Sequence, residues 1–222
     1  MTYSLIIPIY NELRTLPSLV KKLNSLDDSI EIIIVDDGSN DGTEQYLANF
    51  KKFSIIRNNL NLGKGASIKK GVDAASNQNI ILMDGDLEIE IDEIPLFINQ
   101  YNKNNTDVLV GKRWENYQNS NVNLNLVGNF FINFLFNFLY KTSFSDVLCC
   151  VKILKKNKFK SLDLHSNQFA IEVETMAKLV VLKLRIKEIK VKYHRRTAEE
   201  GKKLKFTDSW DIIFTMLKVR FF

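Results

Sequence analysis

Two carboxylates separated by one residue follow a short apolar run near the middle of the chain. Residues 79–83 are typical of a buried strand, and Asp84, Gly85 and Asp86 come directly after them. Hard carboxylate oxygens suit Mg²⁺ or Mn²⁺, and Glu88 is near enough along the chain to add another oxygen. Most isolated Asp-x-Asp pairs are only hydrated turn residues. The preceding strand nevertheless favours a site in which a divalent cation is held between this turn and the diphosphate of a ligand.

A second group of acidic residues follows an earlier apolar run of the same kind. Residues 31–35 form a continuous apolar stretch, after which come Asp36, Asp37 and Gly38. Residues of these types cap helix N-termini and form tight turns. Their carboxylates can equally accept hydrogen bonds from a nucleotide base or ribose, and the spacing by itself favours neither role.

Apolar runs of strand length alternate with segments of helical periodicity through the first half of the chain. We expect strands at residues 4–9, 31–35, 53–57, 79–83 and 107–110, and helices at residues 15–26, 42–50, 66–75 and 94–101. Continuous apolar strands separated by helices predict an α/β fold with a mostly parallel central sheet flanked by helices on both faces. Ligands of such sheets bind beyond the carboxyl ends of the strands, so the polar clusters should meet at one edge.

Composition places the chain among ordinary globular proteins. It has 222 residues, 45% hydrophobic and 26% charged, which suits a single domain with a substantial core. The two cysteines are adjacent and indicate a reducing, cytoplasmic setting. No apolar run reaches the roughly 18 to 20 residues that a membrane-spanning helix needs. The net charge is +5, and the basic excess lies in residues 151–222, which could face phosphates or an anionic membrane.

Several well-known motifs are missing from the sequence. Gly63-Lys64-Gly65 lacks the Ser or Thr and the earlier glycine of a P-loop, and no Gly-x-Gly-x-x-Gly follows the first strand. There is no Gly-x-Ser-x-Gly either. These features argue against a P-loop NTPase, a dinucleotide-dependent dehydrogenase and a serine hydrolase. Because no nucleic-acid-binding motif is present, nucleic acid is not an expected partner.

Eight segments, in order along the chain, carry a family resemblance. IIPIYNE (6–12), IVDDGSNDGT (34–43), NLGKGA (61–66) and MDGDLE (83–88) resemble the family 2 inverting glycosyltransferases. VGKRW (110–114), FSDVLCCVK (144–152), FAIEVE (169–174) and YHRRTAEEGKK (193–203) resemble the dolichol-phosphate mannose synthase branch, which includes bacterial enzymes that attach a sugar to polyprenyl phosphates. The resemblance implies a GT-A type fold, a nucleotide-diphosphate sugar donor and a divalent metal, Mg²⁺ or Mn²⁺.

The resemblance also implies a role for individual residues around the donor. The residues expected to surround the nucleotide are Pro8, Tyr10, Glu12, Val35 and Asp37. Asp84, Gly85 and Asp86 would hold the donor and the metal, with Glu88 at a further ligand position where many relatives have glutamine. Gly85 itself stands where alanine is common, a difference that we expect to be mild.

Basic residues are expected near the phosphates. The resemblance places Arg113 near the sugar and the phosphates, and it places Arg196 and Lys202 on a loop that engages the donor and acceptor phosphates. Departing diphosphate would be stabilised by these cations and by a metal on Asp84 and Asp86. Cys150 replaces the glycine that is usual in its segment, which leaves the shape of the acceptor pocket open.

Three functions follow from these features, in order of preference. The first is transfer of one sugar to a polyprenyl phosphate, whose oxygen is already anionic and needs no protein base. The second is transfer to a sugar hydroxyl in envelope or capsule glycan synthesis, which requires a general base. Asp146 is the candidate base, with a structural role equally open. The third is a protein that binds nucleotide sugars without catalysis.

The C-terminal half contains two amphipathic helices. We expect residues 1–115 to bind the nucleotide sugar and residues 116–222 to face the acceptor and the membrane, within one domain. Residues 123–140 carry asparagine at every fourth position of a Phe/Leu-rich helix, and residues 208–222 repeat the apolar stripe. Such helices suit peripheral association with the cytoplasmic face of the membrane. Packing on the protein's own core and a homodimer face are the alternatives.

Overall fold

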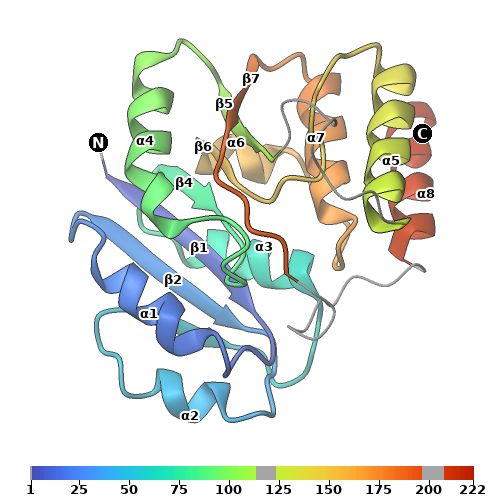
Figure 1. Ribbon diagram of the computed structural model, residues 1–222. Coiled ribbons are helices and arrows are strands. Elements are labelled where there is room, and N and C mark those ends of the chain that lie inside the picture. The colour runs from blue at the N-terminus through green and yellow to red at the C-terminus, as the bar shows by residue number, and fades with distance from the viewer. Residues whose placement is uncertain (1, 114–123, 197–207) are drawn as a thin grey trace.

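The computed structural model describes residues 2–113, 124–196 and 208–222, and it contains one seven-stranded sheet in the order β3-β2-β1-β4-β6-β5-β7 (Figure 1). The strands are β1 (Tyr3–Ile9), β2 (Ile30–Asp36), β3 (Ser54–Arg57), β4 (Asn79–Leu82), β5 (Val108–Lys112), β6 (Lys152–Lys155) and β7 (Ile186–Lys190). β6 runs antiparallel to both its neighbours, β4 and β5, while the other pairs are parallel. The predicted α/β fold with a mostly parallel sheet is confirmed.

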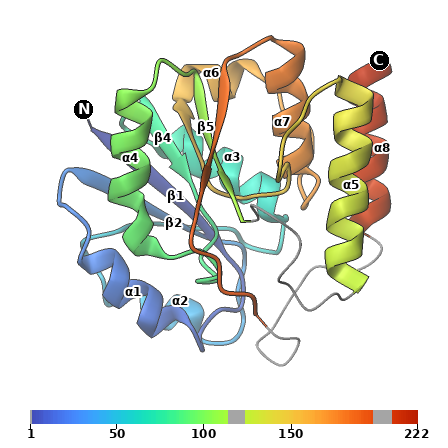
Figure 2. The same ribbon diagram turned by 45° about the horizontal axis from the view of Figure 1, so that its top comes forward.

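Helices cover both faces of this sheet (Figures 1 and 2). One face packs against α1 (Leu16–Asn24), α2 (Thr43–Leu47), the short 3₁₀ helix η1 (Ile91–Glu93) and α4 (Ile94–Lys103). The other face packs against α3 (Lys64–Ala74), α5 (Leu124–Tyr140), α6 (Lys156–Ser161), α7 (Ile171–Val181) and α8 (Asp208–Phe221). The two layers form two separate hydrophobic clusters, one on each side of the sheet.

The apolar runs form strands because both of their faces are buried. In β1, Leu5 and Ile7 pack into the cluster beneath α1, whereas Ile6 points into the cluster on the opposite face. Side chains alternate along a strand, so a strand covered on both sides needs apolar residues at every position. This is why the runs are continuous and do not alternate with polar residues.

The parallel register brings the polar strand ends to one edge. Ile9 pairs with Asp36 in β1 and β2, and Ile6 pairs with Leu82 in β1 and β4. Asp37 N donates to Ile9 O at 2.8 Å directly beyond this pairing. The acidic clusters that follow β2 and β4 therefore lie at the same edge of the sheet, as the sequence predicts.

β6 and β7 carried no expectation from the sequence, whereas β5 was predicted at residues 107–110. β6 begins and ends with lysine, and it has only two apolar residues between them, so it lacks the apolar run by which a strand is recognised. Lys152 at its start is nevertheless fully buried. A charge can occupy such a place only with a partner, and the partner lies on α7, as described below.

Two asparagines of α5, Asn133 and Asn137, bind the protein's own backbone. Asn133 donates from Nδ2 to Phe144 O at 2.8 Å and accepts from Val147 N at 3.0 Å. Asn137 accepts from Phe144 N at 2.9 Å. These two members of the polar stripe hold the segment that contains Asp146.

Both C-terminal helices expose large apolar side chains. α5 and α8 lie side by side in both views (Figures 1 and 2). The exposed residues, here called the α5–α8 apolar face, are Val127, Phe131, Phe134, Phe138, Trp210, Phe214, Leu217 and Phe221. Among the helices that the structure describes, none has both the length and the apolar character needed to cross a membrane.

From the sequence we expect glycine in place of the common alanine at position 85 to matter little. The structure instead encloses Gly85 tightly. A Cβ at Gly85 would lie 2.5 Å from Ile9 Cγ2 and 2.9 Å from Ile7 Cγ2. We expect Gly85→Ala to lower the free energy of unfolding by about 1–3 kcal/mol because the added methyl overpacks this core. Urea denaturation monitored by circular dichroism measures it.

Gly128 provides the matched control for this substitution. It lies within α5, and a Cβ there would meet nothing within 4 Å. Gly128→Ala should therefore raise stability by about 0.5–1 kcal/mol through helix propensity alone. Equal effects of the two substitutions would contradict the packing assigned to Gly85.

Candidate active site

The acidic loop after β4 concentrates negative charge in a partly enclosed place. Asp86 Oδ1 accepts a hydrogen bond from Glu88 N at 3.0 Å, which fixes the turn. Burial raises the pKa of Asp86, and the charges of Asp84 and Glu88 raise it further, to about 7. Arg196 acts in the opposite direction. Carboxylates that disturb one another in this way favour a nearby cation.

These side chains have the donor chemistry that Mg²⁺ and Mn²⁺ prefer. Asp84, Asp86 and Glu88 supply oxygen donors alone, which fits a hard divalent ion. In the arrangement shown by residues 2–113, 124–196 and 208–222, no three His, Cys, Asp or Glu side chains converge closely enough to form a ready metal cage. Asp84 is instead bound to a lysine. A metal at this loop would thus be held by few protein oxygens, with a ligand supplying the rest.

Lys64, the first residue of α3, is the lysine that binds Asp84. Its Nζ lies 2.7 Å from Asp84 Oδ1 and 2.7 Å from Glu172 Oε1 on α7. Glu172 binds the buried Lys152 of β6 through its other oxygen. Burial alone would lower the pKa of Lys64, but Asp84 and Glu172 raise it well above its ordinary value. The four residues form a chain of alternating charge from the loop into the core.

Arg196 reaches the same edge from the far end of the chain. Its guanidinium donates to Glu12 Oε1 at 3.2 Å and to Glu12 Oε2 at 2.9 Å, and its backbone N donates to Glu88 Oε1 at 3.1 Å. Thr15 Oγ1 also donates to Glu12 at 2.8 Å. The structure therefore brings together Glu12, Glu88 and Arg196, three residues that the sequence predicted for the site. Lys202, predicted beside them, lies outside the described residues.

The segment that carries Arg196 runs along the acidic loop. Tyr193 forms an antiparallel bridge with Ile89, and His194 N donates to Glu88 O at 2.7 Å. Beside this segment is a cavity of about 240 Å³, lined by Arg14, Thr15, Asp86, Leu87, His194, Arg195 and Arg196. A cavity with three arginines beside a carboxylate suits an anionic ligand that carries a cation with it.

Asp37 organises the glycine-containing turn in front of α3. Its Oδ1 accepts from Asn58 Nδ2 at 2.7 Å and from Leu62 N at 3.0 Å, and its Oδ2 accepts from Gly63 N at 2.8 Å. Gly63 has φ of 100°, a conformation that side chains disfavour. In this structure Asp37 thus positions the turn that presents Lys64, and its contact with a nucleotide stays a prediction.

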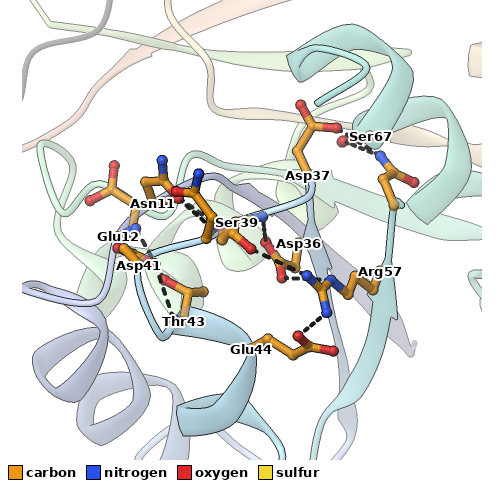
Figure 3. Close-up of polar contacts among 12 residues, drawn as sticks. Asn11, Glu12, Asp36, Asp37, Ser39, Asp41, Thr43, Glu44, Arg57 and Ser67 are labelled. Carbon is orange, nitrogen blue, oxygen red and sulfur yellow. Dashed lines mark hydrogen bonds and ion pairs between the residues drawn. The ribbon is translucent and has the colours of Figure 1, made fainter. Parts of the chain in front are cut away.

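Figure 3 shows how the loops after β1 and β2 are tied together. Asn11 N donates to Ser39 Oγ at 2.8 Å, and Asn40 N donates to Asn11 Oδ1 at 2.9 Å. Arg57 of β3 pairs with Glu44 and lies 3.8 Å from Asp36 Oδ2. These contacts fix the two loops relative to each other, so the edge is organised before any ligand arrives.

The other residues predicted around the nucleotide differ in how far their side chains are exposed at this edge. Pro8 and Tyr10 are half-buried at and just beyond the end of β1, at the edge where the acidic clusters lie. Val35 pairs with Pro8 in the sheet, but its side chain is wholly within the core. Any contact of Val35 with a nucleotide would therefore use its backbone. Gly85 lies between Asp84 and Asp86 and is buried against β1.

Arg113 and Asp146 form a two-pronged ion pair. Arg113 Nε donates to Asp146 Oδ2 at 2.7 Å, and Arg113 Nη2 donates to Asp146 Oδ1 at 2.8 Å. The guanidinium also lies 5.4 Å from the centre of the Tyr193 ring. Both oxygens of Asp146 are occupied, so this carboxylate orients Arg113. A role of Asp146 as a base is a prediction that this geometry does not favour.

Several residues of the edge were not predicted from the sequence. Lys64 was considered only within a failed P-loop and a family motif, and Glu172 only within another family motif. Arg14 and Arg195 were not singled out either. The type of Lys152 and of Glu172 gives no signal of burial, because lysine and glutamate usually face solvent. Only their mutual contact across the sheet makes them informative.

The fold and this edge define an α/β protein of the kind that binds ligands beyond the carboxyl ends of its strands. The sequence model described as Glycosyl transferase family 2 matches residues 4–163. The chain therefore belongs to glycosyl transferase family 2.

Curated relatives align along the whole chain. The chain is 28% identical over 232 residues to a dodecaprenyl-phosphate galacturonate synthase of Rhizobium johnstonii, covering 99% of this chain and 66% of that protein. It is 24% identical over 241 residues to a dolichyl-phosphate beta-glucosyltransferase of Trichomonas vaginalis, covering 99% and 73%. The chain thus spans about two thirds to three quarters of the length of these relatives. Both are named for reactions of polyprenyl phosphates.

A solved structure supports the fold. Glucosyl-3-phosphoglycerate synthase from Mycobacterium tuberculosis, in complex with Mn²⁺, uridine diphosphate and glucosyl-3-phosphoglycerate, superposes with a TM-score of 0.78. The sequence identity is 16%, and the match covers 99% of this chain and 80% of that chain. The GT-A type fold predicted from the resemblance is confirmed.

The buried Glu172 should make stability depend on pH. Burial would raise its pKa, but Lys152 and Lys64 lower it from 4.5 to about 2. Because the folded-state pKa is depressed, the contribution is complete above about pH 4.5 and is lost as the pH falls toward 2. Glu172→Gln should cost about 3–5 kcal/mol at pH 7, since it leaves Lys152 buried without a counter-charge.

Urea denaturation at several pH values between 7 and 3 measures this effect. The stability difference between wild type and Glu172→Gln should shrink as the pH falls below about 4.5. Asp73→Asn is the control, because Asp73 forms an exposed ion pair with Lys160 and should change stability by less than about 1 kcal/mol. A difference that stays constant with pH would refute the assigned pairing.

Proposed function

We propose that the protein is an inverting glycosyltransferase that moves one sugar from a nucleotide-diphosphate sugar to a polyprenyl phosphate. The observation that carries this proposal is the acidic loop of Asp84, Asp86 and Glu88 beside a cavity lined by arginines. Family membership supports the reaction class. The relatives named for dodecaprenyl-phosphate and dolichyl-phosphate products support a lipid phosphate as acceptor.

In this proposal the acidic residues of the edge bind the metal, and the basic residues bind the phosphates. Asp84 and Asp86, with Glu88 beside them, would hold Mg²⁺ or Mn²⁺, which when bound offsets the negative charge of a leaving diphosphate. Arg196, with Lys202, would bind phosphate oxygens from the other side. The Glu12 contact positions the Arg196 guanidinium at the cavity. Preorganised cations of this kind stabilise charge that develops in the transition state.

The geometry of Asp146 bears on the choice of acceptor. Both of its oxygens accept hydrogen bonds from Arg113, and its side chain is 4% exposed. A carboxylate held in this way is poorly placed to take a proton from a sugar hydroxyl. A phosphate acceptor needs no such base because its oxygen is already ionised. We therefore favour a polyprenyl phosphate over a glycan hydroxyl.

The α5–α8 apolar face would place this reaction at a membrane surface. Phe134 and Phe138 are 68% and 73% exposed, and Trp210 is 68% exposed. The last turn of α8 carries Lys218 and Arg220, which suit anionic lipid headgroups. Under this proposal residues 1–115 bind the donor and residues 116–222 face the acceptor and the cytoplasmic leaflet.

Loss of an acidic side chain of the loop should strongly reduce transfer. We expect Asp86→Asn to reduce transfer by roughly 10²- to 10³-fold, the effect of removing one electrostatic contact to the transition state. The measurement incubates labelled UDP- and GDP-sugars with polyprenyl phosphate and Mn²⁺, and then extracts acid-labile lipid-linked sugar. Asp92→Asn removes an exposed acid of the neighbouring η1 and should leave activity unchanged. In a parallel reaction with an added glycan, label that enters the glycan but no lipid would exclude the polyprenyl-phosphate acceptor.

Membrane association should depend on the exposed aromatic residues. The double variant Phe134→Glu/Phe214→Glu should lose flotation with vesicles of anionic phospholipid and polyprenyl phosphate, because glutamate opposes insertion at the interface. Leu96→Glu is the control, since Leu96 is an exposed apolar residue of α4 on the other face of the sheet. Equal flotation of both proteins, or a concentration-dependent dimer that the double variant abolishes, would assign the face another role.

A further inference from the structure

Lys64 stands between two carboxylates that belong to different parts of the molecule. Its Nζ is 2.7 and 2.8 Å from the two oxygens of Asp84 and 2.7 Å from Glu172 Oε1. The side chain of Lys64 is 11% exposed and that of Glu172 is 9% exposed, whereas that of Asp84 is 27% exposed. One partner of the ammonium therefore faces the proposed cation site, and the other faces the core.

The inner partner is fixed from behind. Glu172 Oε2 binds Lys152 Nζ, and Lys152 also donates to Cys149 O at 2.5 Å. The side chain of Lys152 is completely buried. Glu172 therefore keeps its place and its charge whether or not Lys64 remains bound to Asp84.

The start of α3 is also held rigidly against the segment before α7. A Cβ on Gly65 would lie 2.4 Å from Ser166 O, and Ala66 N donates to Asn167 O at 3.1 Å. This close approach fixes the distance between Lys64 and Glu172. The ammonium can thus change its outer partner without a movement of the helix.

We propose that Lys64 is a positioning residue that serves as a built-in counter-cation for Asp84. It releases this carboxylate when the divalent cation binds, an exchange of partners here called the hand-over. Without the cation, Lys64 neutralises Asp84 and holds it in place. When the cation binds Asp84, Lys64 keeps Glu172 as its counter-charge. Glu172 thereby sets how strongly Lys64 competes with the cation. The inference rests on the proposed cation site of the glycosyltransferase.

Opposite effects of two substitutions on Mn²⁺ affinity test the hand-over. Isothermal titration calorimetry of the full chain with Mn²⁺ alone is the measurement. Lys64→Met should tighten Mn²⁺ binding by about tenfold or more, because a positive charge in contact with Asp84 is removed. Glu172→Gln should weaken it by about tenfold, because Lys64 then has Asp84 as its remaining acidic partner in this chain of charges.

A merely structural role predicts a different pattern. If the network only supported the fold, both substitutions would weaken Mn²⁺ binding or neither would change it, and either result overturns the inference. Lys160→Met is the matched control, because Lys160 also pairs with an aspartate but is half exposed. Its Mn²⁺ affinity should equal that of the wild type.

A second variant covers the case in which Glu172→Gln does not fold. The double variant Lys152→Met/Glu172→Gln leaves no buried ammonium in the core and restores the net charge of the network, yet it still deprives Lys64 of its inner partner. It should bind Mn²⁺ about tenfold more weakly than the wild type. A wild type that binds no Mn²⁺ would remove the proposed cation site itself. Normal wild-type binding with unaltered variants would remove the hand-over alone.

Discussion

The structure depends on balancing the negative charge at the carboxyl ends of β1 and β4. Asp84, Asp86 and Glu88 follow one strand and Glu12 follows the other. Burial raises the pKa of Asp86, and the neighbouring charges of Asp84 and Glu88 raise it further. The protein supplies fixed cations from distant segments and leaves the loop beside an arginine-lined cavity. The folded state is most stable when each of these charges is neutralised by a partner within the protein. Binding a cation and a diphosphate would instead require that some of these charges be only partly neutralised.

The sheet positions these charges by combining parallel strands with one antiparallel strand. Parallel β1, β2 and β4 bring the acidic clusters to one edge, while antiparallel β6 carries Lys152 into the layer behind them. α7 then supplies Glu172, which links Lys152 to Lys64 and so to the acidic loop. Buried ion pairs add little net stability compared with apolar packing, but they fix one arrangement of side chains where a site needs it. That is a reason for a fully buried lysine in the middle of a sheet.

Under the proposed function, the two halves of the chain would contribute different surfaces to one reaction. The first half ties its strand-end loops together through Asn11, Ser39 and Asp37, and it forms the edge at which a donor would bind. The second half supplies Arg196, the Arg113–Asp146 pair and the α5–α8 apolar face. Asn133 and Asn137 connect these features, because they hold the segment of Asp146 against a helix whose other side is exposed and apolar. A lipid-linked acceptor would join the two surfaces.

Local patterns in the sequence determined the alternating strands and helices of the first half, the acidic strand ends and the family resemblance, because each depends on residues within a few positions of one another. The strands β6 and β7 had no such pattern, since lysines interrupt their apolar runs. Tertiary structure alone decided the partners of the charged side chains. Arg196 and Glu12 are 184 positions apart, and the contacts of Lys64 with Glu172 and of Arg113 with Asp146 also cross the fold. The type of a buried charged side chain shows that it needs a partner of opposite charge. Only the tertiary structure determines which residue that partner is.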